Sequence, residues 1–213
     1  MITACVLWDL DGTLADTATD IALTVNEMLE ASGLPPLRLL DVHAMIGAGA
    51  KNLVDRAVHA AGGEPDPRHL ERFLAAYRAQ PRRVAELYPG VAELLAAVRV
   101  PQGIVTNKPE GIARALLAAL SVDRHFGVII GGDTLTVRKP SAAPVLAAMR
   151  ALNVSSAVLV GDGPHDVGGA QAAGIPCIGV TWGIGVPAGA SRVVRSVPAL
   201  RDALAARGAC RYR

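Results

Sequence analysis

The chain has 213 residues, of which 51% are hydrophobic and 3% aromatic, and its formal net charge at pH 7 is +2. This aliphatic content is sufficient for a packed core and excludes an intrinsically disordered chain. A net charge so close to zero provides no broad basic surface, so nucleic acid is not an expected partner.

The first predicted element is a strand over residues 3–8, an apolar run without alternation that is typical of a central parallel strand. Residues 16–87 then contain almost no strand-like runs, and glycine and proline pairs divide them. Their patterns predict helices at about 18–32, 39–45, 49–61 and 67–79, and a short one at 82–86. Because this segment is too long for a crossover between strands, we expect a helical insert.

Strands and helices alternate after residue 87. Apolar runs predict four further strands at 102–106, 127–130, 156–160 and 176–180. Helical patterns lie at 91–98, 110–120, 142–152, 165–173 and 197–206. This alternation predicts an α/β fold with a parallel sheet, formed by residues 1–15 and 88–213 and interrupted by the insert of residues 16–87.

The cellular setting is indicated by three cysteines that are far apart and include no Cys-x-x-Cys pair. Such cysteines favour a reducing compartment over a disulfide framework or a cysteine zinc site. The first nine residues lack the basic region of a signal peptide. Residues 167–191 are uncharged, but their seven glycines and two prolines do not suit a spanning helix. We therefore expect a soluble cytoplasmic protein with no membrane partner.

Six polar residues follow four of the predicted strands. They are Asp9 after the first strand, Thr106 and Asn107 at the end of the second, Lys139 in the loop after the third, and Asp162 and Asp166 after the fourth. Because the carboxyl ends of parallel strands lie at one edge of the sheet, where ligands bind in such folds, we expect these side chains to converge.

The stretch "DLDGTLAD" places Asp9, Asp11 and Asp16 directly after the first apolar run. A calcium-binding EF-hand loop is a poor interpretation, because Gly12 falls at loop position four instead of six and a strand precedes it. A solvated turn would explain the Asp-Gly pair alone. It would not explain why charged side chains also follow the other strands.

The pattern D-x-D-G-T-L-x-D, followed by a Thr-Asn pair, a Lys and G-D-x-x-x-D, resembles the haloacid dehalogenase superfamily of phosphatases and phosphomutases. The resemblance implies a doubly wound, Rossmann-like parallel core with a helical cap between the first two motifs. The helical insert lies at that position. One departure is Gly163, which stands where many relatives have serine.

The resemblance also implies roles for the acidic residues. Asp9 would be the nucleophile that forms an aspartyl-phosphate, and Asp11 would move protons to and from the substrate oxygens. Mg²⁺ would be held by Asp9, the Asp11 carbonyl oxygen and Asp162, since hard oxygen ligands suit this ion. For Asp166, a supporting role behind these ligands is favoured over direct ligation.

The same resemblance assigns the phosphoryl oxygens to the Thr106 hydroxyl and the Asn107 backbone N–H. Lys139 would place a positive charge against those oxygens.

The substrate is indicated by the insert, whose stretches "DTATDIALTVNEMLEASGLPP" and "MIGAGAKNLVDRAV" resemble the cap of bacterial phosphoglycolate phosphatases. In this interpretation Gly47 and Gly49 form a loop that faces the site, and Lys51 binds the carboxylate of 2-phosphoglycolate. A plain turn between helices, with Lys51 in solvent, remains open.

Other functions also remain open. The substrate could be a nucleotide, a sugar phosphate or pyrophosphate, and the reaction could be that of a β-phosphoglucomutase-like phosphomutase. Asp11 argues against a dehalogenase, which typically lacks the second acid of the first motif. In every phosphatase reading the partner is a small phosphorylated metabolite, and either a monomer or a dimer is compatible with the sequence.

Overall fold

The computed structural model describes residues 4–210. The strands are β1 (Val6–Trp8), β2 (Ala15–Asp16), β3 (Glu86–Leu87), β4 (Gln102–Val105), β5 (Val128–Ile130), β6 (Val158–Gly161), β7 (Cys177–Val180) and β8 (Arg192–Val194). The helices are α1 (Ala18–Glu30), α2 (Leu39–His43), α3 (Ala50–Ala60), α4 (Pro67–Ala79), α5 (Val91–Ala97), α6 (Glu110–Ala119), α7 (Ala142–Ala151), α8 (Pro164–Ala172) and α9 (Val197–Ala205), with a short 3₁₀ turn at Asp123–His125.

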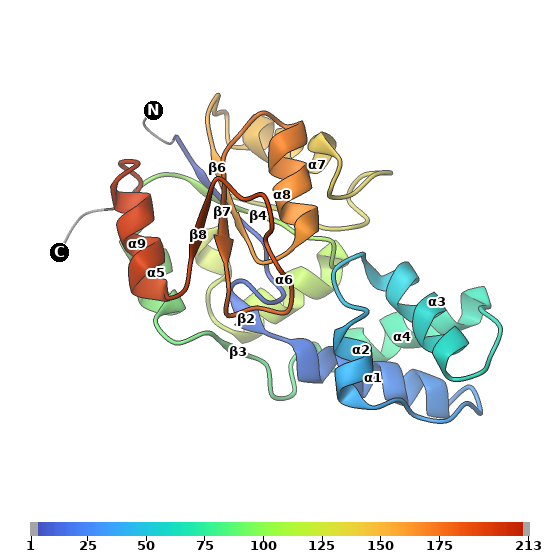
Figure 1. The fold of residues 1–213 in the computed structure, drawn as a ribbon. Helices are drawn as coiled ribbons and strands as arrows, with labels where there is room; N and C mark the ends of the chain where they lie inside the picture. The colour runs from blue at the N-terminus through green and yellow to red at the C-terminus, as the bar shows by residue number, and fades with distance from the viewer. Residues whose placement is uncertain (1–3, 211–213) are drawn as a thin grey trace.

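Six parallel strands form the main sheet in the order β5-β4-β1-β6-β7-β8 (Figure 1). Strand β1 lies inside the sheet and pairs with β4 on one side and β6 on the other. The strand order therefore reverses at β1, which makes this a doubly wound α/β sheet and places a ligand crevice at the carboxyl end of β1.

Helices cover both faces of this sheet, because successive strand residues point to opposite sides. In β1, Val6 and Trp8 pack into a core with α5, α6 and α9, whereas Leu7 packs into a second core with α7 and α8. This two-sided burial explains why the strands appear in the sequence as continuous apolar runs without alternation.

Helices α1–α4 lie together at the lower right of Figure 1 and share a hydrophobic cluster, which Ile112 of α6 also joins. Helix α1 packs against α2, α3 and α4. The chain enters this unit through β2 and leaves it through β3, and these two strands pair antiparallel, with Ala15 opposite Leu87 and Asp16 opposite Glu86.

The short helix predicted at 82–86 is wrong, because this segment returns to the core in extended form and ends in β3. The buried Asp20 carboxylate of α1 accepts backbone hydrogen bonds from Arg83, Val84 and Ala85. These long-range bonds fix the segment in a way that local sequence patterns do not show.

The helix predicted at 67–79 is observed with the same ends as α4, and the other predicted elements are observed with ends shifted by a few residues. The strand predicted at 3–8 covers Val6–Trp8, and residue 3 lies outside the described range, as do the outermost ends of the predicted core segments 1–15 and 88–213. Strand β8 was not predicted, because it is a three-residue edge strand with two exposed residues.

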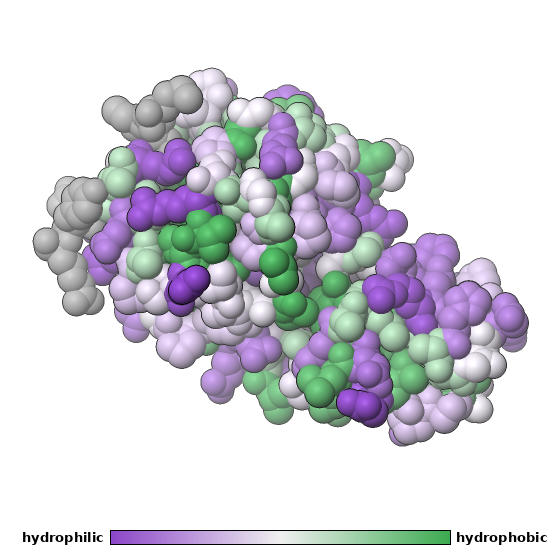
Figure 2. All heavy atoms as spheres, in the orientation of Figure 1, coloured by the Kyte–Doolittle hydropathy of each residue, from purple (hydrophilic) through white to green (hydrophobic). Residues whose placement is uncertain are grey.

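The surface shown in Figure 2 mixes hydrophilic and hydrophobic residues, with neither kind covering the whole visible face. Among the helices of residues 4–210, none has both the length and the apolar character needed to cross a membrane.

Candidate active site

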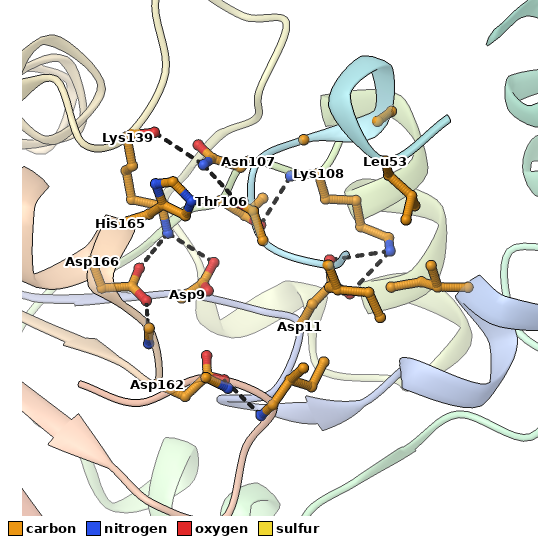
Figure 3. Close-up of a pocket in the computed structure, with 18 of the residues that line it drawn as sticks. Asp9, Asp11, Leu53, Thr106, Asn107, Lys108, Lys139, Asp162, His165 and Asp166 are labelled. Carbon is orange, nitrogen blue, oxygen red and sulfur yellow. Dashed lines mark hydrogen bonds and ion pairs between the residues drawn. The ribbon is translucent and has the colours of Figure 1, made fainter. Parts of the chain in front are cut away.

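A cavity of about 250 Å³ lies between the carboxyl edge of the sheet and helices α1–α4. The sheet side contributes most of the polar side chains predicted from the sequence, and Figure 3 shows them converging from separate strands. The helical side is mainly apolar: Ile21, His43, Ala44, Ile46, Gly47, Gly49, Ala50, Leu53, Phe73 and Tyr77.

Three carboxylates meet at the base of this cavity. Asp9, Asp162 and Asp166 each offer an oxygen atom, and these atoms all lie within 4.8 Å of one another. Lys139 joins the group, with its Nζ 2.9 Å from Asp9 Oδ1 and 2.5 Å from Asp166 Oδ1. The positions from 9 to 166 that the sequence predicted to converge are therefore close in space.

Burial dominates the electrostatics of this group. Desolvation, helped by the neighbouring Asp166 carboxylate, raises the pKa of Asp9 to about 6 even though Lys139 opposes the shift. Burial also raises the pKa of Asp162 and of Asp166. For Lys139 burial alone would lower the pKa, but the Asp166 and Asp9 carboxylates outweigh burial and hold the pKa above its usual value.

Three carboxylates against one ammonium leave two negative charges uncompensated when all four groups are ionised. One divalent cation would neutralise them, and carboxylate oxygens are the donors that Mg²⁺ prefers. The residues present therefore fit a magnesium ion in both charge and donor type.

The Asp162 carboxylate is held in place from three directions. It accepts hydrogen bonds from Thr13 Oγ1 at 3.1 Å and from the backbone N–H groups of Ile184 and Gly185 at 2.8 Å each. Gly12 has a φ of +80°, and a side chain there would collide with the Asp162 carboxylate. The glycine of the first motif therefore allows the β1 loop and the β6 loop to touch.

Asp11 lies apart from the three-carboxylate cluster and faces the helical unit. Its Oδ1 accepts hydrogen bonds from Thr17 Oγ1 at 2.7 Å and from Lys108 Nζ at 2.9 Å, and Lys108 Nζ is 3.3 Å from Oδ2. Neither Lys108 nor Thr17 is among the site residues predicted from the sequence. The sequence feature that could have pointed to Lys108 is its position directly after the Thr106-Asn107 pair, at the end of a predicted strand.

Thr106 and Asn107 are both buried at the end of β4. The Thr106 hydroxyl oxygen accepts a hydrogen bond from the Lys108 backbone N–H, which leaves the hydroxyl proton free to donate. The Asn107 amide donates to the carbonyl oxygen of Gly47 at 2.9 Å and to that of Lys139 at 3.0 Å. Asn107 therefore connects the sheet edge to the loop before α3.

The Gly-Ala-Gly loop lies over the cavity as predicted from the sequence, but Lys51 does not. Gly47 and Gly49 both line the cavity, and Gly49 has a φ of +88°. Lys51 is instead ion-paired with Asp55 one turn further along α3, and 66% of its side chain is exposed. This position of Lys51, exposed and absent from the residues that line the cavity, favours the alternative of a side chain in solvent over that of a substrate ligand.

Comparison with known proteins places this geometry in a family. The family model of haloacid dehalogenase-like hydrolases matches residues 6–180. A phosphoglycolate phosphatase of Rhodospirillum rubrum is 41% identical over 191 residues, covering 84% of this chain and 79% of that protein. A phosphoglycolate phosphatase of Chromobacterium violaceum is 38% identical over 209 residues, covering 92% and 94%.

Solved structures show the same fold. A protein described as a predicted phosphoglycolate phosphatase from Haemophilus somnus aligns with a TM-score of 0.83 at 28% identity, over 90% of this chain and 93% of that one. CbbY from Rhodobacter sphaeroides, solved in complex with phosphate, aligns with a TM-score of 0.75 at 28% identity, over 91% and 94%. The chain belongs to the haloacid dehalogenase-like hydrolase family.

Proposed function

We propose that this phosphoric monoester hydrolase is a Mg²⁺-dependent phosphatase that hydrolyses 2-phosphoglycolate through an aspartyl-phosphate intermediate on Asp9. The observation that carries the proposal is the cluster of Asp9, Asp162, Asp166 and Lys139 beside the cavity. The choice of substrate rests on relatives that are named phosphoglycolate phosphatases and are 38–41% identical.

The ion would be held by carboxylate oxygens of Asp9 and Asp162 and by the backbone carbonyl of Asp11. When bound, Mg²⁺ neutralises the carboxylates and polarises the phosphoryl group, which reduces the repulsion between two anions. The two Asp166 carboxylate oxygens are occupied elsewhere, because Oδ1 accepts a hydrogen bond from Lys139 Nζ and Oδ2 accepts one from the backbone N–H of Gly163. We therefore assign Asp166 to positioning Lys139 and not to direct ligation.

In the first half-reaction an Asp9 carboxylate oxygen attacks phosphorus, and the bond to the leaving oxygen breaks. Asp11 gives its proton to that oxygen, so the alcohol leaves neutral. In the second half-reaction Asp11 takes a proton from the attacking water, and the acyl phosphate is hydrolysed. The first half-reaction leaves Asp11 in the ionised state that the second half-reaction requires.

The phosphoryl oxygens are bound by the Thr106 hydroxyl, the Asn107 backbone N–H and Lys139. The Lys139 ammonium is already in place before the substrate arrives, because two carboxylates hold it. Such preorganised donors are effective because they need not reorient as charge develops in the transition state.

Residues 16–87 act as a cap in this proposal and exclude water from the reaction. The hydrogen bond from Asn107 to the Gly47 carbonyl joins this segment to the sheet edge directly over the cavity. A cavity of about 250 Å³ suits a small ester. All three cysteines are free and buried, which supports our proposal of a cytoplasmic, reducing setting.

The test is phosphate release from 2-phosphoglycolate, sugar phosphates, nucleotides and pyrophosphate, each with Mg²⁺ and with a chelator. We expect 2-phosphoglycolate to give the highest kcat/KM and the chelator to remove turnover. A higher kcat/KM for another ester would reassign the substrate, and turnover of none of them would refute the phosphatase itself.

A further inference from the structure

Lys108 is a buried cation that the proposed reaction does not use. Only 2% of its side chain is exposed, and the charge is compensated by the Asp11 carboxylate. Burial alone would lower the pKa of Lys108, but Asp11, the largest opposing influence, and Tyr77 hold the pKa above its usual value. The side chain is therefore a fixed ammonium group beside the proposed acid–base residue.

The surroundings of this ammonium come from two parts of the chain. Lys108 Nζ donates to the Tyr77 hydroxyl at 2.6 Å and lies 4.3 Å from the centre of the Tyr77 ring. Tyr77 belongs to α4, and its ring packs edge-on against Phe73 of the same helix, with centroids 5.7 Å apart. The cation is thus held between a helix of the cap and a carboxylate of the sheet edge.

The second contact to Asp11 also comes from the border of the cap. Thr17, which is buried directly before α1, donates to the same Asp11 oxygen as Lys108. The Asp11 carboxylate is therefore oriented between the start of α1 and the Lys108-Tyr77 pair. Both supports depend on where the cap helices lie.

We propose that Lys108 is a positioning residue for Asp11, and that Tyr77 makes this positioning depend on the seating of α4 against the core. With α4 in place, the Tyr77 ring and hydroxyl hold the Lys108 ammonium in contact with Asp11, and this contact orients the Asp11 carboxylate for proton transfer. When α4 moves away, Lys108 loses its second partner and gains access to water, so Asp11 loses its alignment. This inference rests on the proposed acid–base role of Asp11.

The experiment uses Lys108→Met, which keeps the length of the side chain but removes the charge, and Tyr77→Phe, which removes one hydroxyl. Their kinetics are compared on 2-phosphoglycolate and on p-nitrophenyl phosphate, whose leaving group departs without protonation. A wrong natural substrate would leave the p-nitrophenyl phosphate measurements valid, so failure of the substrate assignment and failure of this inference are distinguishable.

For Lys108→Met we expect kcat on 2-phosphoglycolate to fall by about 100-fold, within the range that general acid–base catalysis contributes. The first-turnover release of p-nitrophenol should fall less than about threefold, because that step needs no acid. Steady-state turnover of the same ester should fall with kcat on 2-phosphoglycolate, because hydrolysis of the acyl phosphate needs Asp11 as base.

Two outcomes for Lys108→Met would overturn the inference. A rise in KM for 2-phosphoglycolate with unchanged kcat would make Lys108 a substrate ligand. An equal loss in first-turnover and steady-state rates would mean that the substitution damages the whole site. Circular dichroism and urea unfolding establish that the variant is folded.

Tyr77→Phe tests the link to α4 and retains the packing of the ring. We expect kcat to fall by about threefold to tenfold in the wild-type background and to be unaffected when Lys108 is already Met. The same loss in both backgrounds would refute the coupling. Tyr88→Phe is the matched control, since it removes a tyrosine hydroxyl outside this contact, and it should leave kcat unchanged.

Discussion

Replacing Asp9 with Asn should abolish turnover and at the same time stabilise the metal-free protein. The pKa of Asp9 is raised from 3.8 to about 6, chiefly by burial and then by Asp166. At pH 8 without metal, the folded protein therefore carries an ionised group that its surroundings disfavour. A pKa difference of this size corresponds to about 3 kcal/mol, and a neutral amide of the same shape would avoid this cost.

The direction of the pH dependence of stability follows from the difference in proton binding between the folded and unfolded states. Between about pH 4 and pH 6 the folded state holds the Asp9 proton more tightly than the unfolded state, so stability falls as the pH rises through this window. Above pH 6 the full destabilisation is present, and below pH 4 both states are protonated. We therefore expect the free energy of unfolding of Asp9→Asn to be about 3 kcal/mol higher than that of the wild type at pH 8, and the two values to be equal near pH 4.

The assay is urea unfolding followed by circular dichroism at pH 4, 6 and 8, in chelator and again in excess Mg²⁺. Mg²⁺ should stabilise the wild type by mass action and the variant much less. The variant's advantage in free energy of unfolding should therefore shrink or reverse in excess Mg²⁺. A wild type as stable as the variant at pH 8 in chelator would refute the electrostatic reasoning. Substantial turnover by Asp9→Asn would rule out Asp9 as the nucleophile.

Four further substitutions test other parts of the structure. Asp162→Asn should weaken the apparent Mg²⁺ affinity, from activity titrations, by at least about tenfold, because it removes a proposed ligand charge. Asp20→Ala should lower the free energy of unfolding by about 2–3 kcal/mol in urea, since it strands three backbone N–H groups of residues 83–85. Gly49→Ala should cost about 1–2 kcal/mol, because its φ is +88°, and should raise KM by displacing the loop over the cavity. Lys51→Ala should change KM for 2-phosphoglycolate by less than about twofold, because its side chain lies outside the cavity.

Each of these substitutions has a contradicting outcome. Unchanged Mg²⁺ affinity in Asp162→Asn would remove that residue from the proposed ligands. Unchanged stability in Asp20→Ala would mean that the three N–H groups find water as readily as the carboxylate. A normal KM in Gly49→Ala would show that the loop does not contact substrate, and a large KM increase in Lys51→Ala would restore the carboxylate-binding role.

Much of the fold could be predicted from the sequence because its signals are local. The apolar run at β1 and the acids that follow it show both the strand and its end, and the apolar runs at β4 and β6 are likewise followed by polar residues, Thr106 and Asn107 after β4 and Asp162 after β6. By contrast residues 82–86 were predicted as a helix but are extended, because the carboxylate that fixes residues 83–85 is Asp20, more than sixty residues earlier. Edge strand β8 has two exposed residues out of three and lacks the apolar run of its neighbours.

The candidate site was predictable to a similar extent. Asp9, Asp162 and Lys139 follow strands of one parallel sheet, so topology alone brings them to one edge. The partner of Asp11 could not be predicted, because Lys108 and Tyr77 meet only through the placement of α4 against the core. Lys51 shows the opposite case, since its sequence position suggested a ligand and the turn of α3 directs it to Asp55.

The sequence by itself determined the α/β class, the parallel sheet and the set of acids that indicates phosphoryl transfer. These properties depend on apolar patterning and on strand ends, which can be recognised from short stretches of neighbouring residues. Only the tertiary structure decided which cation lies against which acid, with Lys139 between Asp9 and Asp166 and Lys108 against Asp11. Such pairings depend on how separate elements are oriented in space, because the interaction energy of two charges depends on the distance between them and not on their separation along the sequence.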